Sequence, residues 1–279
     1  ALRKVGRYAG GMMGITFLSV MLMQVDKLVL SRLLSLEDYG VYALATVVAG
    51  ALFTLVAPIT QSWFPRLNQL QVEGDKVALA QNFHLGAQMV SVVMGSGAVF
   101  MIVFAEPVLR LWLNDPDLAR QAAPLLRLLA LGNLLNGLMW IPYHTQLAHG
   151  WTSLTISLNI AAVALVVPAI LSVTPHYGAQ GAAMIWAGLN AFYIIVGAQL
   201  MFRRILPAEK WRWYAKDVAL PLLAAINAAL LVAWLRPVSE NAAAEAGLLL
   251  ASGFLVLVAS ALASGQVRRK ILSLAAGLT

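Results

Sequence analysis

Long apolar runs decide what this chain can fold into. Stretches of about 20 mostly apolar residues recur along its whole length, and only 11% of its residues are charged. A soluble domain carries about 25% charged residues, whereas about 20 consecutive apolar residues are enough to cross a bilayer as a helix. The mean hydropathy of +0.79 points the same way. We therefore predict an all-α polytopic membrane helical bundle with no soluble domain of useful size.

The apolar runs predict eight membrane-spanning helices. They are expected at residues 8–34, 39–63, 83–105, 121–148, 151–173, 178–203, 215–235 and 243–264. The first six carry polar residues in their interiors, whereas the last two carry almost none and are expected to face lipid. We therefore predict two units. Residues 1–205 form a six-helix transporter lobe, and residues 206–279 form a cytoplasmic interfacial loop followed by two additional membrane helices.

The basic residues predict the orientation of the chain. Most of the 19 Lys and Arg residues fall in the N-terminal segment, the second and sixth loops and the C-terminal tail, whereas the opposite loops hold Arg110, Arg120 and Arg236. Because cytoplasmic loops carry an excess of Lys and Arg, both termini are expected to be cytoplasmic. The net charge of +7 is explained by the same loops, so we expect no nucleic-acid partner.

Two charges lie inside the first predicted span. Asp26 and Lys27 are neighbours in the segment QVDKLVLSRLLSLEDYGVYALA. A charge at that depth costs about 2.5–3.5 kcal/mol on insertion scales, and adjacent residues point about 100° apart, so the two cannot pair along one helix. We expect each to have a partner or a use, and Lys27 to be neutralised by Asp26, by another helix or by an anionic substrate. Arg127, near the outer start of the fourth span, is the second basic group expected to reach the interior.

Polar residues in the second to sixth spans recur at intervals of three or four, which puts each set on one helical face. The sets are Thr46, Gly50 and Thr54; His84, Gln88, Ser91 and Gly95; Asn133, Asn136, Trp140 and His144; Thr152, Thr155 and Asn159; and Trp186, Asn190, Tyr193 and Gly197. A single set often forms a seam between helices, whereas five sets in succession predict one shared polar cavity. The candidate substrate-binding residues are Lys27, Asp26, Arg127, Asn133, Asn136, His144, Asn159 and Asn190.

Two motifs carry a resemblance to a known family. They are D-K-x-x-x-S-R-x-L-x-x-x-x-Y-G-x-Y-x-x-A, starting at Asp26, and Y-G-A-x-G-A-A, starting at Tyr177. Both resemble the polysaccharide-transport branch of the MOP superfamily, the Wzx-type lipid-linked oligosaccharide flippases. The resemblance implies twelve helices in two six-helix lobes, often followed by two more. Six helices with polar faces and two without them match the second lobe and the extra pair, so the chain is expected to be the C-terminal portion of such a protein.

The resemblance also implies a function. A flippase of this kind moves a polyprenyl-pyrophosphate-linked oligosaccharide across the bacterial inner membrane by alternating access, for O-antigen, exopolysaccharide or capsule synthesis. The implied partners are the lipid-linked oligosaccharide of the undecaprenyl-pyrophosphate type, the bilayer, and polysaccharide polymerase and assembly proteins. Two alternatives stay open: a MATE-like cation-coupled drug exporter, and a non-transporting membrane scaffold of polysaccharide assembly.

The sequence carries no recognisable motif for chemical catalysis. The chain has no phosphate-binding glycine loop followed by Lys-Ser or Lys-Thr. His144 and His149 are five residues apart, a spacing that does not stack two metal ligands on one helical face, and the chain has no cysteine. We therefore expect no enzyme activity, no catalytic residue, no metal site and no cofactor.

Overall fold

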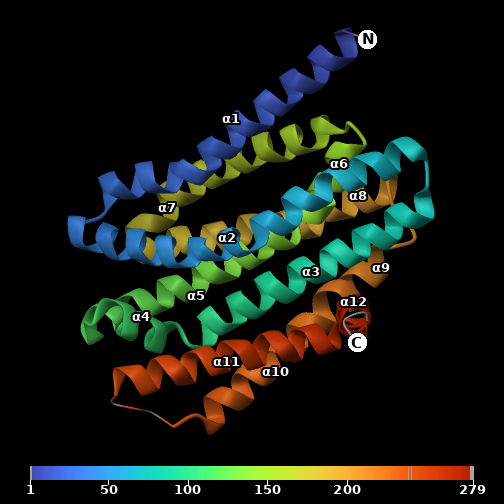
Figure 1. The fold of residues 1–279 in the computed structure, drawn as a ribbon. Coiled ribbons are helices and arrows are strands. Elements are labelled where there is room, and N and C mark those ends of the chain that lie inside the picture. The colour runs from blue at the N-terminus through green and yellow to red at the C-terminus, as the bar shows by residue number, and fades with distance from the viewer. Residues whose placement is uncertain (1, 238, 240, 277–279) are drawn as a thin grey trace.

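The computed structural model describes residues 2–237, 239 and 241–276, and every regular element in that part of the chain is helical. The elements are α1 (Leu2–Leu33), α2 (Leu36–Glu73), α3 (Lys76–Val103), α4 (Ala105–Leu113), α5 (Pro116–Leu138), α6 (Trp140–Ala148), α7 (Thr152–Phe192), the π-helical turn η1 (Tyr193–Gly197), α8 (Ala198–Arg204), α9 (Lys210–Arg212), the π-helical turn η2 (Trp213–Ala219), α10 (Leu220–Leu235), α11 (Ala242–Ala263) and α12 (Gly265–Ala276). The long helices cross the molecule from end to end (Figure 1).

Seven stretches of the described chain are long and apolar enough to cross a membrane. The fold is thus an all-α polytopic bundle, as its composition predicts. The number of stretches is seven rather than the expected eight because residues 152–204 form a single helical stretch of 53 residues.

That stretch folds back on itself. A straight helix of 53 residues would be about 80 Å long, more than twice the hydrocarbon thickness of a bilayer. Gly178 interrupts it with φ 57° and ψ −144°. The Tyr193 hydroxyl donates to Asn159 Oδ1 at 2.8 Å, although these residues would lie about 50 Å apart in a straight helix. The first arm of α7 (152–177) and its second arm (179–192) therefore run in opposite directions (Figure 1). The first arm contains the expected fifth helix, and the second arm continues through η1 and α8 to form the expected sixth.

Local capping explains where several helices begin and end. The Ser35 hydroxyl accepts the backbone N–H of Asp38 and caps α2, and Gly74 ends the same helix with φ 75°. This puts the end of α2 ten residues beyond the expected residue 63. Asp115 caps α5, with Pro116 at the first helical position. Each of these residue types is favoured at the position that it occupies.

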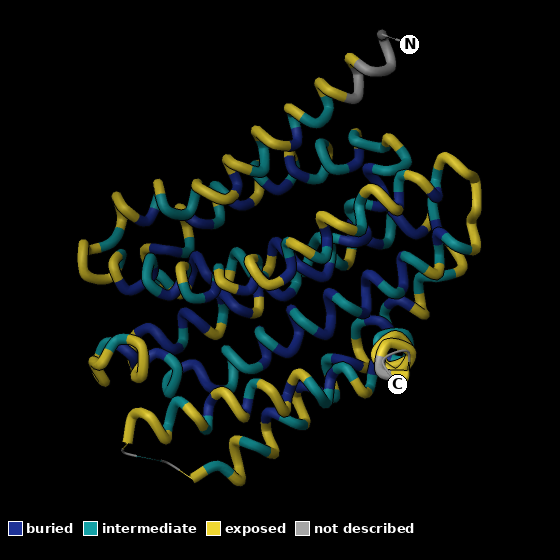
Figure 2. Tube along the Cα trace, in the orientation of Figure 1, coloured by how far each residue is buried: buried dark blue, intermediate teal, exposed yellow. Residues whose placement is uncertain are grey.

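The main core lies between α2, α3, α5, α6, α8 and η2. Its largest fully buried side chains include Phe83, Met94, Phe202 and Trp213. Figure 2 shows the buried residues concentrated on the inward faces of these helices. By contrast, α1 packs chiefly against α7 and makes few contacts with α2. This one-sided packing leaves a hollow between α1 and the rest of the bundle.

The last two long helices cover one side of α3. Ala225 and Ala229 of α10 and Val256 of α11 pack against Val99 of α3. Their other faces expose large apolar side chains, among them Leu230, Leu231, Leu250, Phe254 and Leu255. This arrangement suits helices that face lipid. The division of the chain into a six-helix lobe and an added pair stays a prediction.

The two ends of the bundle differ in charge. The start of α1 and the whole of α12 lie at the same end of the bundle (Figure 1). The α2–α3 and α8–α9 connections lie at this end too. We call this the terminal end. The side chains of Arg3, Lys4 and Arg7 lie outside the described part of the chain. Arg203, Arg204, Lys210 and Arg212 all come from the α8–α9 region at the terminal end. Which side of the membrane this end faces stays a prediction.

Candidate functional site

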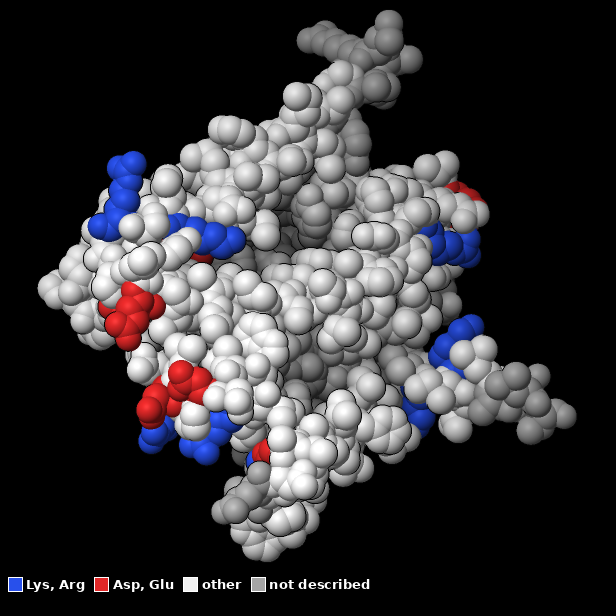
Figure 3. Space-filling model, turned by 60° about the vertical axis from the view of Figure 1, so that its left-hand side comes forward, with Lys and Arg blue, Asp and Glu red and all other residues white. Residues whose placement is uncertain are grey.

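The hollow beside α1 contains two adjoining cavities, one of about 450 Å³ and one of about 380 Å³. Both are lined by Leu22, Met23, Phe53 and Trp186, so they share a wall. Figure 3 shows that the face of the molecule turned toward the viewer is hollowed at its centre. Both volumes lie within the usual range of small-molecule sites, about 300–1,000 Å³.

Amides and aromatic rings line the first cavity, which we call the amide cavity. Its polar and aromatic lining residues are Ser19, Phe53, Asn136, Trp140, Tyr143, Gln146, Thr155, Asn159, Trp186 and Tyr193. They come from α1, α2, α5, α6, α7 and η1, so six elements converge on one space. The polar faces of the fourth, fifth and sixth expected spans do meet here.

A hydrogen-bonded chain of asparagines and tryptophans forms the back of the amide cavity. Asn136 Nδ2 donates to Asn190 Oδ1 at 2.8 Å, and Trp140 Nε1 donates to Asn136 Oδ1 at 3.0 Å. Trp186 Nε1 donates to Asn133 Oδ1 at 2.8 Å, and Asn133 Nδ2 donates to the Ala49 carbonyl at 2.9 Å. These bonds fix the ring planes, because each indole is tied to an asparagine at its nitrogen. The Trp140 ring is also stacked on Phe53, with centroids 5.6 Å apart and planes 5° from parallel.

Asn159, on the first arm of α7, links that arm to α1 and to η1. Its Nδ2 donates to the Ser19 hydroxyl at 3.2 Å, and its Oδ1 accepts the Tyr193 hydroxyl. A buried amide that joins three segments is costly to leave unpaired, since each lost bond strands a polar group. Asn159 therefore holds the open side of the amide cavity in place.

The second cavity, which we call the charged cavity, holds both ionisable residues of the first span. Its lining includes Asp26, Lys27, Tyr42, Thr46 and Asn133. Asp26 Oδ2 accepts the Tyr42 hydroxyl at 2.6 Å, and Asp26 Oδ1 is buried with no hydrogen-bond partner among the described residues.

The two charges do not pair with each other. Lys27 Nζ donates to Gln24 Oε1 at 3.4 Å, a same-helix contact three residues back. Asp26 thus has the partner on another helix that was expected, whereas the weakly held Lys27 ammonium faces the cavity.

Two expected site residues do not join the cavities. Arg127 is exposed and lines neither of them. It lies half a helical turn round from Asn136, because nine residues correspond to about 900°. His144 packs between the rings of Phe64 and Tyr143 instead. The expectations that Arg127 reaches the interior and that His144 lines the shared cavity are therefore wrong.

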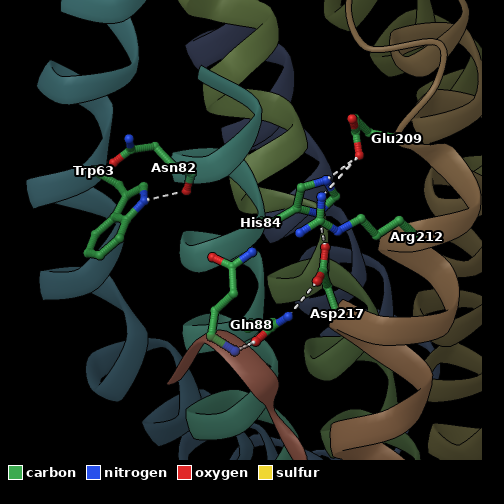
Figure 4. A network of polar contacts seen from close by, with 8 residues as sticks. Trp63, Asn82, His84, Gln88, Glu209, Arg212 and Asp217 are labelled. Carbon is green, nitrogen blue, oxygen red and sulfur yellow. Dashed lines mark hydrogen bonds and ion pairs between the residues drawn. The ribbon is translucent and has the colours of Figure 1, made fainter. Parts of the chain in front are cut away.

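The polar face of α3 also faces elsewhere. His84 and Gln88 were expected to line the shared cavity, but they contact the C-terminal part of the chain (Figure 4). His84 Nδ1 faces Asp217 Oδ2, and His84 Nε2 lies 2.8 Å from Glu209 Oε2. Gln88 Nε2 donates to Asp217 Oδ1 at 2.8 Å. Gly95, further along this face, lies against Leu222 of α10.

These contacts form a buried ion network. His84 and Asp217 are fully buried, and Glu209 is 24% exposed with Arg212 3.6 Å away. Each ring nitrogen of His84 thus faces a carboxylate oxygen, which is a hydrogen-bond acceptor. Asp217 is a fully buried carboxylate in contact with both His84 and Gln88. Among the described residues, no group of three His, Asp or Glu is placed to hold a metal ion.

Sequence reasoning missed several residues of the site. Tyr42 and Phe53 are on the same span as Thr46 but outside its polar set, and Gln146 follows His144 by two residues. Tyr42 belongs to the quoted motif at Asp26, and its position 16 residues after Asp26 reflects a tight helical hairpin. That spacing was the available signal for the Asp26–Tyr42 contact.

Comparison with known families finds a match for the N-terminal part of this chain. Residues 1–116 match a family described as "Polysaccharide biosynthesis protein". That region contains α1 to α4, and therefore Asp26, Lys27 and Tyr42 of the charged cavity. Comparisons with curated proteins and with solved structures yield no match. The family match and the seven apolar helices together support a multi-pass membrane protein related to polysaccharide biosynthesis.

Proposed function

We propose that the chain belongs to a Wzx-type flippase that moves a polyprenyl-pyrophosphate-linked oligosaccharide across the bacterial inner membrane, toward the outer leaflet. The observation that carries the proposal is the pair of adjoining cavities beside α1: one lined by amides and indoles, the other by a lysine at membrane depth. A substrate with a sugar part and an anionic part needs two such neighbouring environments.

The amide cavity suits the sugar. Hydroxyl groups of a sugar donate to and accept from amides, and the flat face of an indole stacks on a pyranose ring. The side-chain oxygens of Asn136 and Asn159 each accept one hydrogen bond, from Trp140 and Tyr193 respectively. A carbonyl oxygen has two lone pairs, so each can accept a further bond from substrate. The indoles of Trp140 and Trp186 are held at fixed angles by their asparagine partners.

The charged cavity suits the pyrophosphate. Lys27 carries an ammonium whose described hydrogen bond, to Gln24, is long at 3.4 Å. Bonds between an ammonium and a phosphate oxygen are charge-assisted and stronger than neutral ones. Since a bare charge inside a span is costly, a lysine in this place is consistent with an anionic substrate.

In the proposed arrangement this chain supplies the C-terminal lobe and the additional helix pair, and the hollow beside α1 faces a second six-helix lobe. Both termini lie on the cytoplasmic side. Alternating access moves the lobes against each other, with an ion gradient or mass action as the drive. Polymerase and assembly proteins are the proposed partners downstream, and no chemical reaction or cofactor is involved.

The test is polysaccharide export in a bacterium that depends on this protein, normalised to the amount of protein in the membrane. Lys27→Ala and Trp140→Ala are expected to lower export per molecule at least ten-fold. Trp112→Ala, an exposed tryptophan on α4, is the matched control and is expected to leave export unchanged. Unchanged export per molecule in both cavity variants refutes the proposal.

A MATE-like exporter is the second candidate, and one observation favours it. Asp26 Oδ1 is buried at the charged cavity with no hydrogen-bond partner among the described residues, and a free carboxylate oxygen suits a cationic drug or a coupling cation. Drug resistance separates the two candidates. If the protein confers resistance to cationic drugs that Asp26→Asn removes, and export is unaffected, the exporter is the better account.

A further inference from the structure

The last helix, α12, lies across the bundle rather than along it. In Figure 1 it is seen end-on, whereas the spanning helices run across the view. In Figure 3, which is turned by 60°, α12 projects from the body with basic side chains at its base. A helix that runs across the spanning helices at the end of the bundle lies along the membrane surface rather than through it.

The sequence of α12 is amphipathic and basic. With 100° per residue, Val267, Ile271 and Leu274 fall on one face. Arg268 and Lys270 lie at the two borders of that face, and Arg269 lies opposite. Basic residues at both borders can extend to lipid headgroups while the apolar side enters the acyl region.

Most of α12 has no protein to pack on. Arg268 to Leu274 are all exposed, including Ile271 at 51% and Leu274 at 59%. An isolated helix shorter than about 12–15 residues is marginal in water, and α12 has 12 residues. The apolar face and the helix itself therefore need a surface outside the described chain.

Basic and aromatic side chains at the terminal end indicate that this surface is the lipid headgroup layer. Trp211 of α9 is 74% exposed, and Lys210 Nζ lies 4.5 Å above its ring. Arg204 lies over the Trp151 ring at 4.3 Å. Indoles with neighbouring cations are typical of the headgroup level. The start of α12 is held at that level, because Gln88 Oε1 accepts the backbone N–H of Gln266 at 2.9 Å and Gln88 is bonded to Asp217.

We propose that α12 is a lipid-binding helix, which lies in the headgroup layer at the terminal end and binds anionic phospholipid through Arg268, Arg269 and Lys270. Its apolar face enters the leaflet and its polar face stays in water. Each basic residue near an anionic surface strengthens binding about five-fold. The three basic residues of α12 should therefore make it bind anionic lipid much more tightly than neutral lipid.

Site-directed spin labels test this directly, because the chain has no cysteine to interfere. Leu274→Cys puts a label on the apolar face, and Ser273→Cys puts one on the polar face. The purified protein is placed in bilayers of phosphatidylcholine containing increasing fractions of phosphatidylglycerol. The readout is the collision rate of each label with oxygen and with a water-soluble nickel complex.

We expect the Leu274 label to become shielded from nickel as the anionic fraction rises, while the Ser273 label stays accessible. Neutralising the three charges (Arg268→Gln, Arg269→Gln, Lys270→Gln) should raise the anionic fraction needed for half-maximal shielding at least five-fold, or abolish the response. The matched control, Arg110→Gln with Arg120→Gln at the opposite end, should not change it. The proposal would be overturned if the two labels were equally accessible, or if shielding did not change with the anionic fraction. It would also be overturned if shielding depended on protein concentration, because self-association would then explain it.

Discussion

Removing Asp217 is the sharpest test of how the C-terminal helices are attached. Asp217 is fully buried between His84 and Gln88, which donate to its two oxygens. Asp217→Ala leaves His84 Nδ1 and the Gln88 side-chain N–H without the carboxylate that they share. Breaking a buried ion pair by removing one partner costs about 3–5 kcal/mol.

The expected size of the effect follows from that range. In a chain of this length, 1 kcal/mol corresponds to roughly 2–4 °C in melting temperature, so Asp217→Ala should lower it by about 6–20 °C. Asp217→Asn should have a smaller effect, because an amide oxygen still accepts from Gln88. Adding His84→Leu to Asp217→Ala should recover part of the loss, since the unpaired imidazole nitrogen is gone and Glu209 keeps Arg212 nearby.

The assay is thermal unfolding of the purified protein in one detergent at one lipid content. Asp117→Ala is the control, because Asp117 belongs to an exposed ion pair with Arg120, and such pairs contribute about 0–1 kcal/mol. A melting temperature for Asp217→Ala that matches the wild type within about 2 °C, or a double variant less stable than the single one, would contradict the buried network.

Three further predictions concern the turn, the cavity wall and the topology. Gly178→Ala is expected to destabilise the protein by about 1–3 kcal/mol, measured by melting temperature, because its positive φ is strained for other residues. Gly132→Val is expected to displace the Trp186 ring, which lies where a Cβ would be, and so to weaken substrate binding in a protein that still inserts; unchanged affinity would show that the ring is not part of the site. Cysteines at Ala208 and Asp115, both exposed, should be labelled from opposite sides of the membrane, and labelling from the same side would refute the topology.

The fold class and the position of most spans could be predicted because bilayer thickness imposes one length on every helix. The number of spans depended on residues 173–178, where Thr174, Pro175 and His176 interrupt the apolar pattern. Gly178 belongs to the motif that starts at Tyr177, and its positive φ is the physical reason for the fold-back. The helix α12 was missed, because a 12-residue basic tail has no spanning-length apolar signal.

The site could be predicted in part. Asn133, Asn136, Asn159 and Asn190 lie at or behind the amide cavity because polar residues at helical spacing share a face. The same rule was wrong for His84 and Gln88, because a polar face can meet a neighbouring helix as well as a cavity. Periodicity shows which residues point together, whereas only packing determines toward which neighbour they point.

Direct binding of substrate tests the central claim most directly. The affinity of the purified protein is measured for undecaprenyl-pyrophosphate carrying an oligosaccharide and for undecaprenyl-pyrophosphate without sugar, in wild type, Lys27→Gln and Trp140→Ala. A charge-assisted hydrogen bond contributes about 1.5–3 kcal/mol, so Lys27→Gln should weaken binding of both lipids roughly 10- to 150-fold. Trp140→Ala should weaken binding of the sugar-bearing lipid alone. Equal affinity of the wild type for both lipids, together with no effect of either substitution, would contradict a role of the two cavities in moving lipid-linked oligosaccharide.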